Sequence, residues 1–83
     1  GDVVTVLIVA ANYHQTRRHY AIQLTPMRRG ASGASLCATD VFDQEYQNFT
    51  AEIFGSKPVD NASLPLCKLC ERKAAKEGME VPT

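Results

Sequence analysis

The segment from residue 66 to residue 78 reads LCKLCERKAAKEG and combines a cysteine pair with a run of strong helix formers. Cys67 and Cys70 form a C-x-x-C pair, a spacing that lets two thiolates converge on one metal ion. Gly78 suits the position just beyond the end of a helix. Because the N-terminal amides of a helix stabilise negatively charged sulfur, this segment predicts a metal-binding turn that leads into a helix.

A tetrahedral zinc site needs two further ligands. Cys37 offers a third sulfur from a distant part of the chain. For the fourth ligand we rank His19 first, because it begins a predicted strand beside a polar turn, and His14, within that turn, second. Asp40 ranks third. Cys37 and Asp40 have the same spacing as Cys67 and Cys70, like the two knuckles of a zinc ribbon, but Asp40 also suits the N-cap of the next helix. The predicted Zn²⁺ ligands are therefore His19, Cys37, Cys67 and Cys70.

Three other interpretations of the cysteines compete with zinc: a redox dithiol, a disulfide that leaves one thiol over, and buried free thiols. The odd number of cysteines argues against a pure disulfide framework. A thioredoxin-type pair follows a strand in a longer βαβ fold than 83 residues can supply. A chain of this size buries only about 60% of its unfolded surface, so a zinc cross-link is the favoured interpretation.

The first half of the chain predicts two strands and a loop. Residues 3–11 are β-branched and apolar, which indicates a buried strand, whereas residues 19–25 alternate in polarity like a half-buried strand. We expect these two strands to pair in an antiparallel manner and the second to end at Pro26. Residues 28–35 are rich in glycine, serine and alanine, which predicts a flexible loop.

Residues 41–54 predict a helix, because Phe42, Tyr46, Phe49 and Ile53 recur at helical spacing and form an apolar stripe. This apolar and acidic helix, or the basic loop, is the expected surface for a partner. Asp40 is the expected N-cap, and Gly55 suits the position after the last turn. Residues 47–54 also alternate in polarity, so a strand is the alternative there. Overall we expect one α+β domain over residues 1–78, with a small antiparallel sheet and one or two helices, and a frayed tail at 79–83.

The segments His19-Tyr-Ala, Ser35-Leu-Cys37 and Leu66-Cys-Lys-Leu-Cys70-Glu-Arg-Lys together resemble the small His–Cys–CxxC zinc-binding proteins of actinobacteria and their phages. The resemblance implies a zinc-ribbon-like or treble-clef-like metal site and suggests a phage protein that acts on a host factor. The chain departs from that pattern in two ways. Ala38 stands where the family usually has glycine, and the stretch between Cys37 and Cys67 is long enough for an inserted helix.

Nine basic and nine acidic residues give no net charge, which argues against a generic nucleic-acid coat or a polybasic membrane binder. No signal peptide is visible, and the apolar run at 6–11 is far shorter than the ~20 residues of a membrane span. No carboxylate pair has a catalytic context. We therefore expect a non-enzymatic, cytoplasmic zinc protein that modulates a protein partner.

Two alternative functions remain open at the level of sequence. Residues 1–35 carry four arginines and one aspartate, so a nucleic-acid-binding zinc module that uses this half is the first. The second is a thiol redox protein in which Cys67 and Cys70 oxidise reversibly without bound metal.

Overall fold

The computed structural model describes residues 4–82 and shows one sheet and two helices. The strands are β1 (Ile8–Asn12), β2 (Arg18–Ala21), β3 (Thr25–Pro26), β4 (Ala31–Ala34) and β5 (Asp40–Phe42). The helices are α1 (Gln44–Ile53) and α2 (Lys68–Lys76), with a short 3₁₀ turn η1 (Asn61–Ser63) between them. All strand pairs are antiparallel, in the order β2-β1-β5-β4-β3, which confirms the predicted α+β class.

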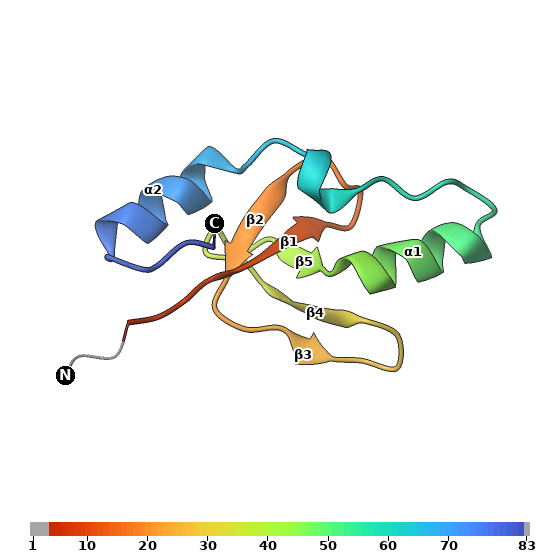
Figure 1. Cartoon of the computed structure of the whole chain (residues 1–83), viewed down its shortest axis with the longest axis horizontal. Helices are drawn as coiled ribbons and strands as arrows, with labels where there is room; N and C mark the ends of the chain where they lie inside the picture. Colours follow the sequence, from red (N-terminus) through yellow and green to blue (C-terminus); the bar gives the residue numbers. More distant parts are fainter. Residues whose placement is uncertain (1–3, 83) are drawn as a thin grey trace.

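The two helices lie at opposite ends of an elongated molecule that measures 47 × 25 × 22 Å (Figure 1). Helix α2 packs on the edge strand β2. Helix α1 lies beside the hairpin of β3 and β4, where Gly30 in the hairpin turn is close to Tyr46 of α1 (Figure 1). Neither helix of the described residues has the length and apolar character needed to cross a lipid bilayer.

The predicted antiparallel pair at the start of the chain is confirmed, with Ile8 opposite Ala21 and Ala11 opposite Arg18. The second strand is shorter than predicted. It ends at Ala21, and Ile22, which the prediction included in the strand, lies beyond it and is 53% exposed. The chain bends away here because Ala21 bridges to Ser35, and Pro26 then lies inside β3 rather than after a strand.

The flexible loop predicted for residues 28–35 is wrong, because residues 31–34 form strand β4 between β3 and β5. Small side chains allow this strand to pack closely. A Cβ at Gly33 would lie 2.6 Å from the carbonyl oxygen of Gln23. Gly30 turns the hairpin with a φ of +73°, and a Cβ there would collide with the first turn of α1. The glycines thus specify a tight hairpin instead of flexibility.

Helix α1 confirms the predicted helix over the strand alternative at 47–54, and Gly55 follows it with a φ of +67°. The predicted start at residue 41 is wrong, because residues 41 and 42 belong to β5. The predicted N-cap is wrong: Asp40 belongs to β5, and Asp43 caps α1 by accepting a hydrogen bond from the Tyr46 amide at 3.0 Å. Asp43 directly precedes the first helical residue, Gln44, so its carboxylate reaches the free amides of the first turn.

The predicted apolar stripe does not form the buried face of α1. The buried residues are Gln47 and Ala51, whereas Ile53 is 62% exposed. Gln47 faces the sheet because its side-chain amide donates a hydrogen bond to the Asn12 carbonyl at 3.0 Å. This bond gives a partner to the backbone carbonyl at the end of β1. Phe42 of the predicted stripe lies in β5. On α1, Tyr46 and Phe49 are half-buried and Ile53 is exposed.

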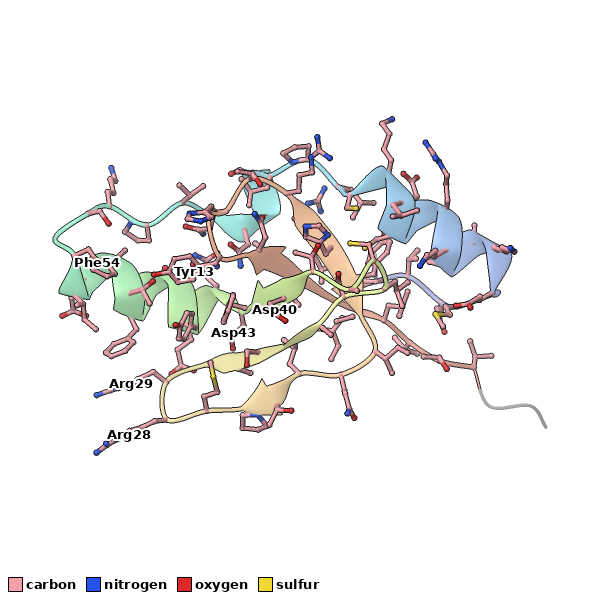
Figure 2. The ribbon with its side chains drawn as sticks, turned by 180° about the vertical axis from the view of Figure 1, so that it is seen from behind. Tyr13, Arg28, Arg29, Asp40, Asp43 and Phe54 are labelled. Carbon is pink, nitrogen blue, oxygen red and sulfur yellow. The ribbon has the colours of Figure 1, made fainter. Side chains whose placement is uncertain are left out.

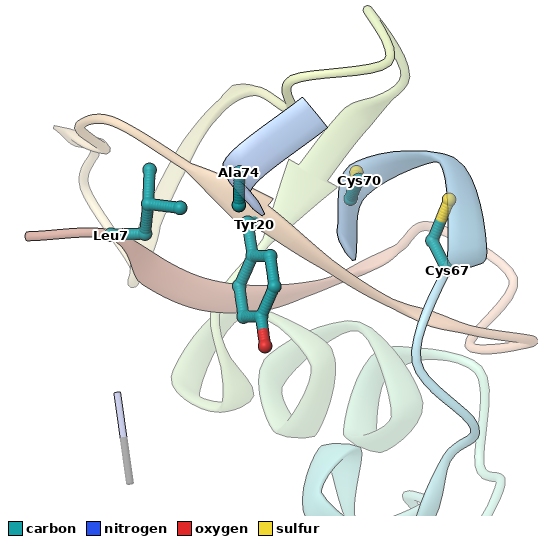
Figure 3. Close-up of a cluster of buried hydrophobic side chains, with 5 residues drawn as sticks. All are labelled: Leu7, Tyr20, Cys67, Cys70 and Ala74. Carbon is teal, nitrogen blue, oxygen red and sulfur yellow. The ribbon is translucent and has the colours of Figure 1, made fainter. Parts of the chain in front are cut away.

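The core consists of two small clusters on the sheet. One contains Leu7, Tyr20, Cys67, Cys70 and Ala74 and joins the sheet to α2 (Figure 3). The other contains Ala10, Ala21 and Val41. The largest side chains with under 2% exposure are Val41 and Cys70. With so little bulky apolar material, the fold needs a further source of stability.

Backbone hydrogen bonds extend to Glu80, two residues beyond the predicted end of the domain at residue 78. The Glu80 amide donates to the Thr5 carbonyl at 2.8 Å, and the Leu7 amide donates to the Glu80 carbonyl at 2.9 Å. Met79 packs against the α2 cluster. Hydrogen-bonded structure thus reaches Glu80, and the boundary of a zinc-stabilised domain at residue 78 stays a prediction.

Candidate metal centre

Four side chains from three separate segments meet at the outer edge of β2. The ligand atoms of His19, Cys37, Cys67 and Cys70 all lie within 4.8 Å of one another. The Nδ1 atom of His19 is 3.4 Å from the sulfur of Cys37 and 3.7 Å from that of Cys70. The sulfurs of Cys37 and Cys67 are 4.0 Å apart. These are the four residues that the sequence predicted to share one site.

The backbone of β2 explains why the segments converge here. Its outer edge is hydrogen-bonded by two pieces of chain: the Arg18 carbonyl accepts from the Cys67 amide at 2.7 Å, and the Tyr20 carbonyl accepts from the Leu36 amide at 2.8 Å. His19 lies between these two attachment points. The cysteine turns are thereby fixed on either side of the imidazole.

Cys37 lies in a tight turn that links β4 to β5. The Ser35 amide donates to the Thr39 carbonyl and the Ala38 amide to the Ser35 carbonyl, each at 2.9 Å. Ala38 has a φ of +67°, a left-handed conformation that costs a non-glycine residue about 1–2 kcal/mol. The glycine expected by family resemblance would adopt this turn without that cost, yet the turn forms with alanine.

Cys67 and Cys70 belong to the first turn of α2. Cys67 is the N-cap residue, and its side chain makes no capping hydrogen bond. Cys70 is fully buried beneath the helix, with its thiol toward His19. The free amides and the dipole at the N-terminus of α2 favour anionic sulfur. A thiolate of Cys67 bound to a metal could therefore stabilise this helix end in place of a capping side chain.

The thiols differ in acidity. Burial opposes ionisation of Cys37, but hydrogen bonds with Ser35 and Thr39 prevail and lower its pKa from 9.0 to about 5. Burial raises the pKa of Cys70, and the backbone amides of Tyr20 and Cys37 offset this only in part. The Cys37 thiol is therefore more acidic than the Cys70 thiol, whose proton a bound metal would displace.

The geometry of the cluster fits a tetrahedral ion. Zn–S bonds of about 2.3 Å and Zn–N bonds of about 2.0 Å place neighbouring ligand atoms roughly 3.5–3.8 Å apart. The separations found between Nδ1 and the sulfurs, and between two of the sulfurs, span 3.4–4.0 Å. His19, Cys67 and Cys70 are buried and Cys37 is half-buried, so the described side chains enclose the site. The four residues can therefore hold a metal ion.

The two other candidates for the fourth ligand lie outside this cluster. His14 is exposed in the turn after β1, where its ring meets the Tyr13 ring edge-on at 5.3 Å. Asp40 is exposed on β5. Sequence reasoning missed Ser35 and Thr39, which hydrogen-bond the Cys37 sulfur at 3.1 and 3.5 Å. Ser35 and Thr39 each lie two residues from Cys37, and this spacing is not a recognised motif, so no signal in the sequence indicated their role.

Comparison of the chain with protein-family models, curated proteins and solved structures gave no match. What the structure defines is a small α+β protein with one histidine and three cysteines grouped so that they can bind metal.

Proposed function

We propose that this chain is a non-enzymatic protein whose fold is held by one structural Zn²⁺ ion and which acts as a protein–protein interaction module. The observation that carries the metal assignment is the meeting of four ligand atoms within 4.8 Å. Three sulfurs and one imidazole nitrogen form a Cys₃His set, which is typical of structural zinc. The ligands are contributed by His19, Cys37, Cys67 and Cys70.

A structural role is favoured because four protein ligands complete the tetrahedron. A catalytic zinc ion keeps one position for water or substrate, which this set does not leave. The ion would instead tie α2 and the Cys37 turn to β2, because its ligands come from all three. It would thus cross-link a protein whose buried clusters are small.

An interaction role is favoured by the apolar surface that α1 leaves uncovered. Ile53 and Phe54 are 62% and 73% exposed, and Phe49, one helical turn before Ile53, is half-buried and lines the same hollow as Ile53. Exposed apolar surface of this kind commonly marks a contact site for another protein. Whether the partner is a host factor of a phage, as the family resemblance suggests, stays a prediction.

The nucleic-acid alternative draws less support from the placement of the arginines. The side chain of Arg18 donates to the Leu64 carbonyl at 2.7 Å and is half-buried, so it serves the fold. Arg28 and Arg29 extend from the tip of the β3–β4 hairpin, and Glu45 shares a hollow with Arg29. A phosphate backbone would meet mixed charge there instead of a basic surface.

The metal assignment is tested by native mass spectrometry of the purified protein, before and after chelation, with reactive thiols counted in parallel. We expect one zinc ion per chain and three thiols that become reactive only when the ion is removed. A metal-free protein with a reversible Cys67–Cys70 disulfide would establish the redox alternative instead. Binding of DNA or RNA that weakens steeply with added salt would establish the nucleic-acid alternative.

A further inference from the structure

The exposed side of α1 and the tip of the β3–β4 hairpin enclose a groove with an aromatic floor. We call it the α1 groove and define it by Arg28 and Arg29 of the hairpin and by Glu45, Phe49, Glu52 and Ile53 of α1. It contains two neighbouring hollows of about 550 and 490 Å³. Arg29 and Phe49 line both hollows, so the two form one continuous surface.

The α1 residues of this groove recur at intervals of three and four, which places them on one helix face. Phe49 is half-buried, Ile53 is 62% exposed, and Phe54 at the end of α1 is 73% exposed. A helix of a globular protein normally turns such an apolar face toward its core. Here Gln47 and Ala51 occupy the core side, so the apolar face is free to contact another protein.

The two walls of the groove carry opposite charges. Glu45 and Glu52 are exposed on α1, and Arg28 and Arg29 project from the hairpin. The guanidinium of Arg29 lies 5.5 Å from the centre of the Phe49 ring. Figure 2 shows both arginines at the end of the molecule where Phe54 closes α1. A ligand in the groove would therefore be oriented by charge, with its basic side toward α1.

The outer edges of the sheet do not suit the alternative mode of docking, in which a partner adds a strand. Two segments already hydrogen-bond the outer edge of β2, at Arg18 and at Tyr20. At the other edge β3 has only two residues, and Pro26 lacks an amide hydrogen. The face of α1 over residues 45–53 is about 12 Å long and matches two turns of a helix.

We propose that the α1 groove binds an amphipathic helix of a partner protein, whose apolar side chains cover Phe49 and Ile53 and whose lysine or arginine side chains face Glu45 and Glu52. The mode is that of a helix in a groove, in which apolar anchors supply affinity and charges set orientation. This inference rests on the proposed role as an interaction module and names its docking surface.

The test uses the zinc-loaded full chain, labelled with ¹⁵N, and two synthetic helical peptides. Both peptides carry leucine on one face and glutamate on the flank that meets Arg28 and Arg29; the flank that meets Glu45 and Glu52 is lysine in one peptide, the lysine peptide, and glutamate in the other, the glutamate peptide. We expect the lysine peptide to shift the amide signals of residues 27–30 and 45–54 and to leave those of α2 unchanged. The glutamate peptide should bind at least about tenfold more weakly, since two attractive pairs become repulsive.

A charge exchange sharpens the test. The double variant Glu45→Lys, Glu52→Lys should bind the lysine peptide about tenfold more weakly and should gain affinity for the glutamate peptide. The matched control Glu77→Lys, Glu80→Lys makes the same change of net charge at exposed residues near α2 and should leave both affinities unchanged.

Equal affinity for the two peptides, an equal effect of both double variants, or no binding of the lysine peptide would overturn the proposal. Signal shifts elsewhere on the molecule would retain an interaction module and refute the α1 groove as its docking surface. Self-association through the groove in concentration-dependent sedimentation would identify a second copy as its occupant and overturn the proposed partner. Metal content is measured on the same sample, so failure of the zinc assignment is seen separately.

Discussion

Removal of the metal with EDTA is expected to unfold this protein under conditions in which the zinc-bound form is stable. A structural zinc ion contributes about 10–16 kcal/mol of apparent free energy near neutral pH in small zinc modules. A chain of 83 residues has a total stability of about 4–12 kcal/mol at the usual 0.05–0.15 kcal/mol per residue. A zinc ion bound as proposed would therefore supply as much free energy as the whole fold commonly retains.

The packing around the site gives the same expectation. Cys67 and Cys70 are two of the five buried residues that join α2 to the sheet, and Tyr20 is the only aromatic residue among these five. Without the ion, only long hydrogen bonds of 3.4–4.0 Å that involve sulfur would join the three cysteines and the imidazole. Helix α2 would then detach from β2 and carry Cys67 and Cys70 away from His19.

The assay follows far-UV circular dichroism during a chelator titration, with zinc release measured by a colorimetric indicator and thiols by a thiol reagent. Loss of helical signal should coincide with release of one zinc ion per chain and exposure of three thiols. Added zinc should restore the signal under reducing conditions. If the metal-free chain keeps a cooperative melting transition at an unchanged Tm, the reasoning about both the centre and the fold is refuted.

Three further outcomes are expected. His19→Ala should abolish zinc retention in native mass spectrometry, whereas His14→Ala should retain the ion; the reverse result would make the exposed histidine the ligand. Ser35→Ala removes a hydrogen bond that lowers the pKa of the Cys37 thiol, so protons should compete more strongly with zinc for this sulfur. On acidification, the variant should therefore release zinc at a pH that is higher by roughly a few tenths of a unit. In thermal melting, Gly30→Ala should lose about 1–3 kcal/mol more than Gly55→Ala. Both glycines have positive φ, but only the added methyl group at Gly30 meets backbone atoms, and equal losses would show that the hairpin tip does not pack on α1.

The identity of the ligands could be predicted from the sequence because ligand chemistry is a property of residue type. The C-x-x-C spacing followed by helix formers placed Cys67 and Cys70 correctly at the start of α2. The preference for His19 over His14 rested on its place at the start of a strand, and the structure brings His19 to the cysteines. Local signals of this kind depend on a few neighbouring residues and not on distant contacts.

The face of α1 could not be predicted in the same way. Its periodic apolar residues fit a core-facing stripe, but the orientation of a helix depends on what the sheet offers it. The carbonyl of Asn12 selects the Gln47 amide, and this contact turns Phe49 and Ile53 outward. The loop predicted at residues 28–35 failed for a related reason, since strand β4 is stabilised by pairing with β3 and β5.

The sequence by itself determined the α+β class, the helix at each predicted place and the four residues that can bind a metal. These follow from residue chemistry and short-range periodicity. Only the tertiary structure decided that the Cys37 turn and the Cys67 segment attach to the same edge of β2 on either side of His19, and that α1 exposes its apolar face. Both depend on hydrogen bonds between residues far apart in the chain, which no local pattern records.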